Sequence, residues 1–301
     1  MNGTGFGPGS CGELVQGVTS AGNRFQVSLP LDSGTTATAE VAPASQTSVR
    51  IGPAHRWKAA RAAQLCLHLL EVPPQRVALQ LDSALTVGRG MGSSTADIVA
   101  TARAVADALD RPLSREDAGL IAGAIEPSDA TMYDGIAVAD RRGALLRDWS
   151  WWPTFNVVML VPPTVVVTES VDFRGQEQNA AVYETLLRRL DEAVSRRDSA
   201  AFVAAAELSA DLNQRHLANP LLETAREWRG PLGALGCNIA HTGSLVGLLF
   251  AGDAAGRSAA GDACRRLRHV PRLRGVDVLL AATPASAPLL SARHSPLCAG
   301  T

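Results

Sequence analysis

Thr86-Val87-Gly88-Arg89-Gly90-Met91-Gly92-Ser93-Ser94-Thr95-Ala96 leads from a segment of strand pattern into a segment of helix pattern. Apolar and polar residues alternate over 76–82 before it, and apolar residues recur at helical spacing over about 94–109 after it. Backbone N–H groups of such a loop, together with the positive end of the helix dipole, bind phosphate. The predicted phosphate-binding residues are Gly88, Gly90, Met91, Gly92, Ser93, Ser94 and Thr95.

The two common nucleotide motifs do not describe this loop. A Walker A loop needs a lysine before its hydroxyl residue, and the only lysine of the chain is Lys58. The glycine spacing also differs from the G-x-G-x-x-G dinucleotide fingerprint. A different class of phosphate loop is therefore indicated.

The patterns on both sides of the loop predict an α+β fold. Strands are expected at 24–29, 35–41, 76–82, 133–146, 155–167, 239–250 and 276–281, and helices at 57–71, 94–109, 114–126, 177–197, 199–217 and 220–229. A cluster of tryptophans near residue 150 suggests a boundary there. We expect one domain over 1–150 and a second over 151–301.

Composition excludes several classes of protein. A net charge of −1 over 301 residues argues against nucleic acid as a partner. The first residues lack a signal-peptide pattern, and the apolar stretch 157–167 is too short to span a bilayer, so we expect a cytoplasmic protein without a membrane partner. Five scattered cysteines fit neither a disulfide framework nor a zinc site. The sequence leaves a homodimer open.

The loop resembles the second motif of the GHMP kinases (galactokinase, homoserine, mevalonate and phosphomevalonate kinases), P-x-x-x-G-L-G-S-S-A-A. Thr86, Met91 and Thr95 replace the usual Pro, Leu and first Ala. Two further segments resemble the L-threonine kinases of cobalamin biosynthesis associated with propanediol utilisation. They are Pro8-Gly9-Ser10-Cys11-Gly12-Glu13-Leu14-Val15-Gln16-Gly17 and Glu126-Pro127-Ser128-Asp129. Asn238-Ile239-Ala240-His241-Thr242-Gly243-Ser244 stands where the family has its third motif.

This resemblance implies an amino-terminal domain of mixed strands and helices and a carboxy-terminal domain with a ferredoxin-like core. ATP and Mg²⁺ are the implied cofactors, with Thr242 and Gly243 near the nucleotide. The implied reaction phosphorylates the side-chain hydroxyl of L-threonine. Two alternatives stay open: the same chemistry on another hydroxy amino acid or small alcohol, and a non-catalytic nucleotide or metabolite sensor.

Acidic residues are the candidates for metal binding and proton transfer. Glu126 resembles the family's Mg²⁺-binding glutamate, with Ser94 as a hydroxyl ligand. Asp129 is the candidate catalytic base or substrate-orienting carboxylate, in competition with Asp134 and with a mechanism that uses no protein base. The alternative for Glu126 and Asp129 is that they cap a helix end or a turn.

The amino-terminal motif is the candidate acceptor site. The expected substrate-binding residues are Ser10, Cys11, Gly12, Glu13 and Gln16. Glu13 suits an ammonium group, which favours a small-molecule hydroxy amino acid as substrate. A nucleophilic Cys11 with His241 as its base is the weaker interpretation, since nothing else completes such a site.

Positive charge for the phosphates has few sources. The mevalonate kinase branch has a lysine after its first Pro-Gly, where this chain has Ser10; Lys58 lies elsewhere in the sequence. Arg89 is therefore either a phosphate-binding residue or a solvated one.

Overall fold

The computed structural model describes residues 1–133, 135–149, 151–164 and 175–284. The strands are β1 (Asn2–Val18), β2 (Arg24–Pro43), β3 (Ser48–Gly52), β4 (Gln75–Ser83), β5 (Val138–Asp140), β6 (Leu145–Arg147), β7 (Phe155–Val161), β8 (Gly236–Ile239), β9 (Val246–Ala251) and β10 (Asp277–Ala282). The helices are α1 (Trp57–Leu69), α2 (Ser93–Ala108), α3 (Arg115–Gly123), α4 (Ala180–Arg196), α5 (Ser199–Asn213), α6 (Leu221–Leu232) and α7 (Ala254–Leu267), with 3₁₀ helices η2 (Gln176–Asn179) and η3 (Pro271–Leu273). This mixture confirms the α+β class. In the described part of the chain, no helix is long and apolar enough to span a membrane.

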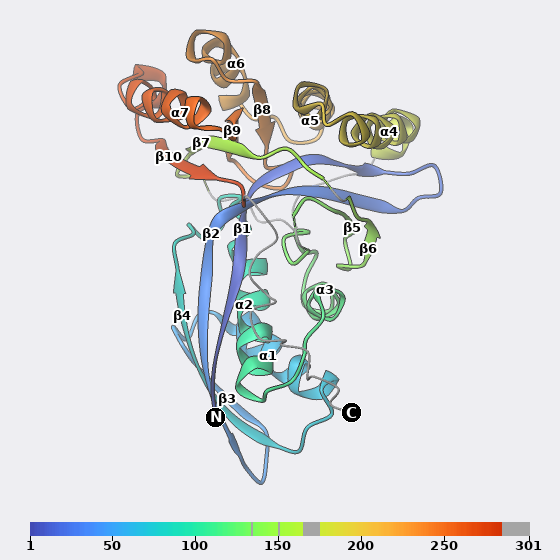
Figure 1. The fold of residues 1–301 in the computed structure, drawn as a ribbon, viewed down its shortest axis with the longest axis vertical. Coiled ribbons are helices and arrows are strands. Elements are labelled where there is room, and N and C mark those ends of the chain that lie inside the picture. Colours follow the sequence, from blue (N-terminus) through green and yellow to red (C-terminus); the bar gives the residue numbers. More distant parts are fainter. Residues whose placement is uncertain (134, 150, 165–174, 285–301) are drawn as a thin grey trace, which may run out of the picture.

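One sheet connects the two ends of the molecule. Its strand order is β10-β7-β9-β8-β1-β2-β4-β3, with β5 paired to β2 and β6 paired to β5. The long antiparallel hairpin of β1 and β2 runs from the lower end of Figure 1, where α1 to α3 cover the sheet, to the upper end, where α4 to α7 pack. β1 meets β8 through the pair Glu13 and Ile239, so the amino-terminal motif lies at the junction.

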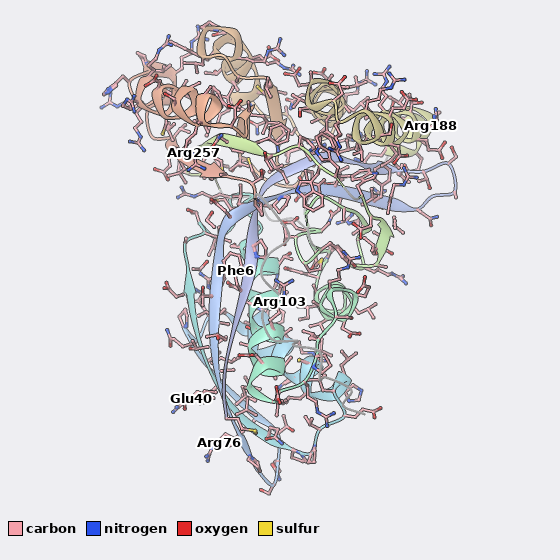
Figure 2. All side chains as sticks on the ribbon, viewed as in Figure 1. Phe6, Glu40, Arg76, Arg103, Arg188 and Arg257 are labelled. Carbon is pink, nitrogen blue, oxygen red and sulfur yellow. The ribbon has the colours of Figure 1, made fainter. Side chains whose placement is uncertain are left out.

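Glycines on β1 explain how α2 is positioned. Gly3, Gly5 and Gly7 face the helix, and a Cβ on each would come within 2.2 Å of an α2 backbone atom. Because no side chain intervenes, the helix lies directly on the strand. Arg103 of α2 fixes this contact by donating a 2.7 Å hydrogen bond to the Phe6 carbonyl, and the two residues lie side by side in Figure 2. The phosphate loop thus leads into a helix that is packed directly on the sheet.

Among the described residues, buried hydrophobic side chains form one cluster at the lower end and two at the upper end. At the lower end, α1 and α2 pack on β2 and β4. At the upper end, Leu14 and Phe25 of the hairpin pack with Tyr183 of α4 and Phe202 of α5. β1 and β2 therefore contribute to both ends, and the division of the chain near residue 150 stays a prediction.

Several predicted elements end at other residues. The helix expected over 114–126 has the predicted capping box of Ser114 and Asp117 but ends at Gly123, which frees Glu126 from the helix. The strand expected over 239–250 is a hairpin, because the backbone turns between β8 and β9. The segment 133–146 holds β5 and the start of β6, joined by a turn in which Asp140 accepts hydrogen bonds from two backbone N–H groups. The strand expected over 155–167 ends at Val161 as β7.

Candidate active site

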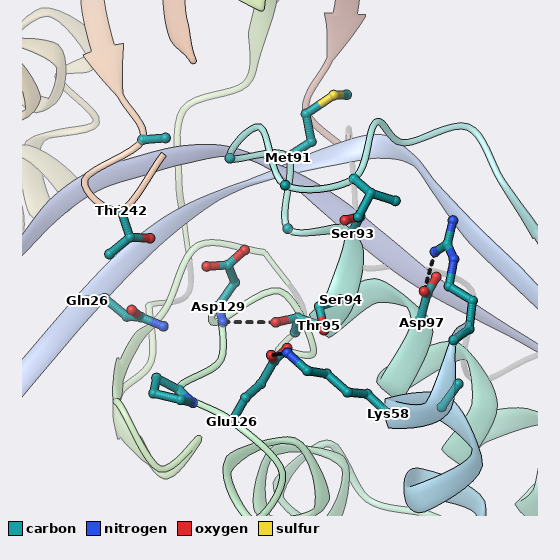
Figure 3. Close-up of a pocket in the computed structure, with 18 of the residues that line it drawn as sticks. Gln26, Lys58, Met91, Ser93, Ser94, Thr95, Asp97, Glu126, Asp129 and Thr242 are labelled. Carbon is teal, nitrogen blue, oxygen red and sulfur yellow. Dashed lines mark hydrogen bonds and ion pairs between the residues drawn. The ribbon is translucent and has the colours of Figure 1, made fainter. Parts of the chain in front are cut away.

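A cavity of about 320 Å³ lies where the phosphate loop, the start of α1, the segment after α3 and the β1–β2 hairpin meet (Figure 3). It is lined by residues 55–59 of α1 and its approach, by 87, 88, 90–95 and 97, by Glu126, Pro127 and Asp129, by Glu13, Gln16 and Gln26, and by Arg141, Ala240 and Thr242. Most of the residues that the sequence singled out therefore meet in one place.

The loop reaches α2 through three left-handed glycines. Gly88, Gly90 and Gly92 have φ of 74°, 89° and 63°. A Cβ on Gly92 would lie 2.4 Å from Asp129 Oδ2 and 2.6 Å from Ser10 Oγ, so only glycine fits there. α2 has no side-chain cap and no acidic residue in its first turn. Its positive end is therefore available to an anion.

The turn between β8 and β9 supports the loop from the other side. A Cβ on Gly243 would lie 2.7 Å from Gly90 Cα, so the two backbones are in direct contact. Thr242 lines the cavity, as its place in Figure 3 shows, whereas Gly243 supports the loop from outside the lining. Both residues thus lie at the loop.

Asp129 lies between the loop and the amino-terminal motif. Its Oδ2 accepts a 2.8 Å hydrogen bond from Ser10 Oγ, and its backbone N–H donates to Thr95 Oγ1 at 3.2 Å. Burial is the largest cause that raises the pKa of Asp129 to about 7, and the negative charge of Glu13 is the second. The hydrogen bond from Ser10 lowers this pKa and offsets part of the rise. The carboxyl group therefore titrates near neutral pH, where a general base is effective.

Glu13 is buried beside Asp129 and is tied to the β8–β9 turn. Its Oε2 accepts a 2.7 Å hydrogen bond from the backbone N–H of His241. The His241 ring is buried, with Nε2 3.0 Å from Ser209 Oγ and Nδ1 3.3 Å from the Ile239 carbonyl oxygen. His241 is thus a packing residue of the turn.

The interpretation of Cys11 as a nucleophile is wrong. The thiol is fully buried and lies 3.8 Å from Asn238 Oδ1, and burial raises its pKa far above the ordinary value. The ring nitrogens of His241 contact other residues. Neither Cys11 nor Gly12 lines the cavity; a Cβ on Gly12 would lie 2.6 Å from Ala240 N. Their visible role is to pack β1 against β8.

Lys58, to which the sequence assigned no role in the site, lines the cavity. Lys58 Nζ forms an ion pair with Glu126 Oε2 inside the cavity, as Figure 3 shows. Next to it, Arg56 pairs with Asp97. Arg89 instead pairs with Asp277 at 3.0 Å and does not line the cavity. The cations at the phosphate loop therefore come from the start of α1, which is remote in sequence from the loop.

The residues at this end suit a Mg²⁺ ion that is bound together with phosphates. Mg²⁺ takes oxygen ligands, usually one or two carboxylates with waters and phosphate oxygens. Glu126 and Ser94 both line the cavity and supply a carboxylate and a hydroxyl. Among the described residues, no group of three or more His, Cys, Asp and Glu forms a metal centre by itself. The donor set thus fits Mg²⁺ only as a partner of a phosphate ligand.

The other end of the cavity contains polar side chains that the sequence analysis missed. Gln26 donates a hydrogen bond from Nε2 to the Ser128 carbonyl oxygen. Arg141 comes directly after β5, which pairs with β2 at Phe25 and Gln26. Gln26 and Arg141 line the cavity together with Gln16. No motif marks Gln26 or Arg141, because only the pairing of distant strands brings them here. Asp134, the competitor of Asp129, lies outside the described residues.

Comparison with known proteins finds similarity to one group of kinases. Residues 57–138 match the family model described as GHMP kinases N terminal domain. An L-threonine kinase of Citrobacter freundii is 29% identical over 81% of this chain and 84% of its own length. An L-threonine kinase of Salmonella typhimurium is 28% identical over 81% of each chain.

The solved structures agree on the fold. Homoserine kinase from Cytophaga hutchinsonii superimposes with a TM-score of 0.70 at 15% identity, over 95% of both chains. Mevalonate kinase of L. major, in complex with R-mevalonate, gives 0.67 at 18% identity, over 95% of this chain and 97% of its own. Residues 57–138 thus match the amino-terminal domain of the GHMP kinases, and most of the chain is similar to two L-threonine kinases. Both likenesses support a phosphotransferase that acts on a hydroxyl group.

Proposed function

We propose that this kinase transfers the γ-phosphoryl group of ATP to the side-chain hydroxyl of L-threonine. The hydroxyl oxygen attacks the γ-phosphorus while the bond to the β,γ-bridging oxygen breaks, and ADP leaves with that electron pair. Asp129 takes the hydroxyl proton, and the products are O-phospho-L-threonine and ADP. The observation that carries the proposal is the position of Asp129, which lies between the start of α2 and the Ser10–Glu13 segment.

The phosphate end of the cavity suits ATP. The uncapped start of α2 supplies backbone N–H groups, and Ser93, Ser94 and Thr95 add hydroxyls. Trp57 and Val87 have large exposed apolar side chains that line the same cavity, and they suit the base of the nucleotide. Glu126 and Ser94 would hold Mg²⁺, which neutralises phosphate charge.

The acceptor end suits an amino acid. The carboxyl groups of Glu13 and Asp129 lie close enough for each to affect the other, and an ammonium group between them would offset their repulsion. Such a cation also favours the ionised form of Asp129, so substrate binding would prepare the base. Arg141, Gln16 and Gln26 line the cavity nearby and offer donors to a carboxylate.

The choice of L-threonine over other hydroxy amino acids rests on the two relatives that carry this name. It also agrees with the amino-terminal motif, which contributes Ser10, Glu13 and Gln16 to the acceptor end or to its border. Neither argument depends on the fold, which is shared with homoserine and mevalonate kinases.

A panel of acceptors tests the proposal. ADP release from Mg²⁺-ATP is measured with L-threonine, L-serine, L-homoserine and mevalonate at equal concentrations, and the phosphorylated product is identified by mass. We expect the highest kcat/KM with L-threonine. A strong preference for another alcohol would replace threonine as the substrate. The absence of any acceptor-stimulated ADP release would favour a sensor.

A further inference from the structure

We propose that Lys58 forms an ion pair with Glu126 before the nucleotide binds and moves to the phosphates when Mg²⁺-ATP binds. There its ammonium group would stabilise the negative charge of the phosphates during phosphoryl transfer. Lys58 is thus both a competitor of Mg²⁺ and a catalytic residue. The inference rests on the proposed use of ATP and Glu126, but it does not depend on which acceptor is phosphorylated.

The geometry brings Lys58 to the metal position. Its side chain leaves the first turn of α1 and meets Glu126 beside the first turn of α2, as Figure 3 shows. The two side chains are 28% and 11% exposed, so the pair is largely removed from solvent but borders the cavity. A ligand that enters the cavity therefore reaches both groups.

The position of Lys58 is unfavourable for α1 itself. The amino-terminal end of a helix is positive and prefers acidic residues, yet the first turn of α1 has none and contains Lys58 instead. Arg56 immediately precedes the helix, which adds a second cation. Both α1 and α2 thus direct positive ends toward one cavity, which is the arrangement that a polyphosphate would stabilise.

The two cations differ in how firmly they are held. Arg56 pairs with Asp97, which is buried and also accepts a 2.8 Å hydrogen bond from Thr35. That network connects the start of α1 to α2 and β2, and it does not include Glu126, the proposed metal ligand. The partner of Lys58 is the carboxylate that Mg²⁺ would take, and a cation and Mg²⁺ repel each other at one carboxylate. Lys58 is therefore the cation that metal binding would release.

Once released, Lys58 remains next to the phosphates. A lysine side chain is flexible and presents a compact charge with three donors, so it can exchange a carboxylate for a phosphate oxygen within the same cavity. This would compensate for the lysine that is absent at Ser10. A purely structural ion pair between α1 and the segment after α3 is the competing explanation.

Three variants separate the explanations. Lys58→Met removes the charge, and Lys58→Arg keeps it. Arg61→Met is the matched control, because Arg61 lies one turn further along α1, is exposed and donates to Gln64 Oε1 of the same helix at 3.2 Å. Thermal melting of each variant confirms that it is folded.

Two measurements are made on each variant. The first is kcat with saturating ATP and acceptor. The second is calorimetric binding of ADP at increasing Mg²⁺ concentrations without acceptor, which yields the Mg²⁺ concentration for half-maximal binding. For Lys58→Met we expect kcat to fall by roughly 10²-fold, as for the loss of a charge-stabilising group, while the required Mg²⁺ concentration also falls. Lys58→Arg should retain most of kcat, and Arg61→Met should match the unmodified protein.

Either measurement, kcat or the Mg²⁺ requirement for ADP binding, can contradict the proposal. A normal kcat in Lys58→Met, or an unchanged or higher Mg²⁺ requirement, overturns the proposal. Loss of thermal stability with both readouts unchanged assigns Lys58 to a structural ion pair. Because the calorimetry uses no acceptor, it gives its answer even if L-threonine proves to be the wrong substrate.

Discussion

Ser10 and Asp129 are joined by a 2.8 Å hydrogen bond from Ser10 Oγ to Asp129 Oδ2, across 119 positions of the sequence. Gly92 packs against both side chains, so the phosphate loop, the amino-terminal motif and the acidic segment form one unit. A displacement of any one of the three must move the other two. Because of this coupling, a substitution in one of the three segments should affect the others.

Asp129→Asn should lower kcat by about 10²–10⁴-fold, the usual contribution of a general base, with a much smaller effect on ATP binding. In the unmodified enzyme, the acceptor kcat/KM should fall as the pH decreases below about 7, because Asp129 then becomes protonated. The kcat/KM of Asp129→Asn should not show this fall below about pH 7. A near-normal kcat in Asp129→Asn would remove Asp129 from catalysis.

The same pKa predicts an effect on stability. Folded Asp129 keeps its proton up to about pH 7, whereas the unfolded chain loses it near the ordinary value of 3.8. Between these values the folded state binds more protons, so the free energy of unfolding decreases as the pH rises. Asp129→Asn should therefore raise Tm more above pH 7 than at mildly acidic pH. Asp262→Asn, an exposed control on α7, should show no such gain.

Gly92→Ala should damage the site beyond the cost of backbone strain. The left-handed conformation alone costs about 1–2 kcal/mol for alanine. The new Cβ would also press on Asp129 and Ser10, and a displacement near 1 Å can reduce activity on the order of 10²-fold. Gly22→Ala is the control, because Gly22 has φ of 79° but open space around it. Equal kcat/KM in the two variants would contradict the predicted coupling.

Trp57→Leu should weaken nucleotide binding and raise the KM for ATP. The indole is 61% exposed at the cavity, and stacking on a base contributes about 1–3 kcal/mol. ADP should change the tryptophan fluorescence of the unmodified protein but not that of Trp57→Leu. Trp228→Leu, which changes a ring beside Arg266 on the far helices, should retain the signal. An unchanged ADP affinity in Trp57→Leu would exclude stacking.

The sequence was sufficient for the parts of the site that are local. The strand, loop and helix around Gly92 are consecutive, so their pattern predicts their arrangement, and α2 begins at Ser93, within one residue of the expected start. The capping box at Ser114 was likewise readable from four neighbouring residues.

Long-range pairing explains what the sequence did not reveal. Lys58 is 68 positions from Glu126, and nothing in the helical pattern of α1 indicates which carboxylate its ammonium meets. Arg141 reaches the cavity only because β5 pairs with β2. Such contacts depend on strand register and helix packing, which a single sequence does not specify.

Arg141→Met should raise the KM for the acceptor with little effect on the KM for ATP. Burial and the nearby charge of Arg24 lower the pKa of Arg141, so the guanidinium lies where an incoming carboxylate would stabilise it. Losing a hydrogen bond to a charged group costs about 1.5–3 kcal/mol, which corresponds to a tenfold or larger rise in KM. Arg142→Met changes the exposed neighbour and should leave both KM values unchanged. If Arg141→Met instead raises the KM for ATP alone, the guanidinium belongs to the nucleotide, and the substrate carboxylate must be held by Gln16, Gln26 or backbone N–H groups.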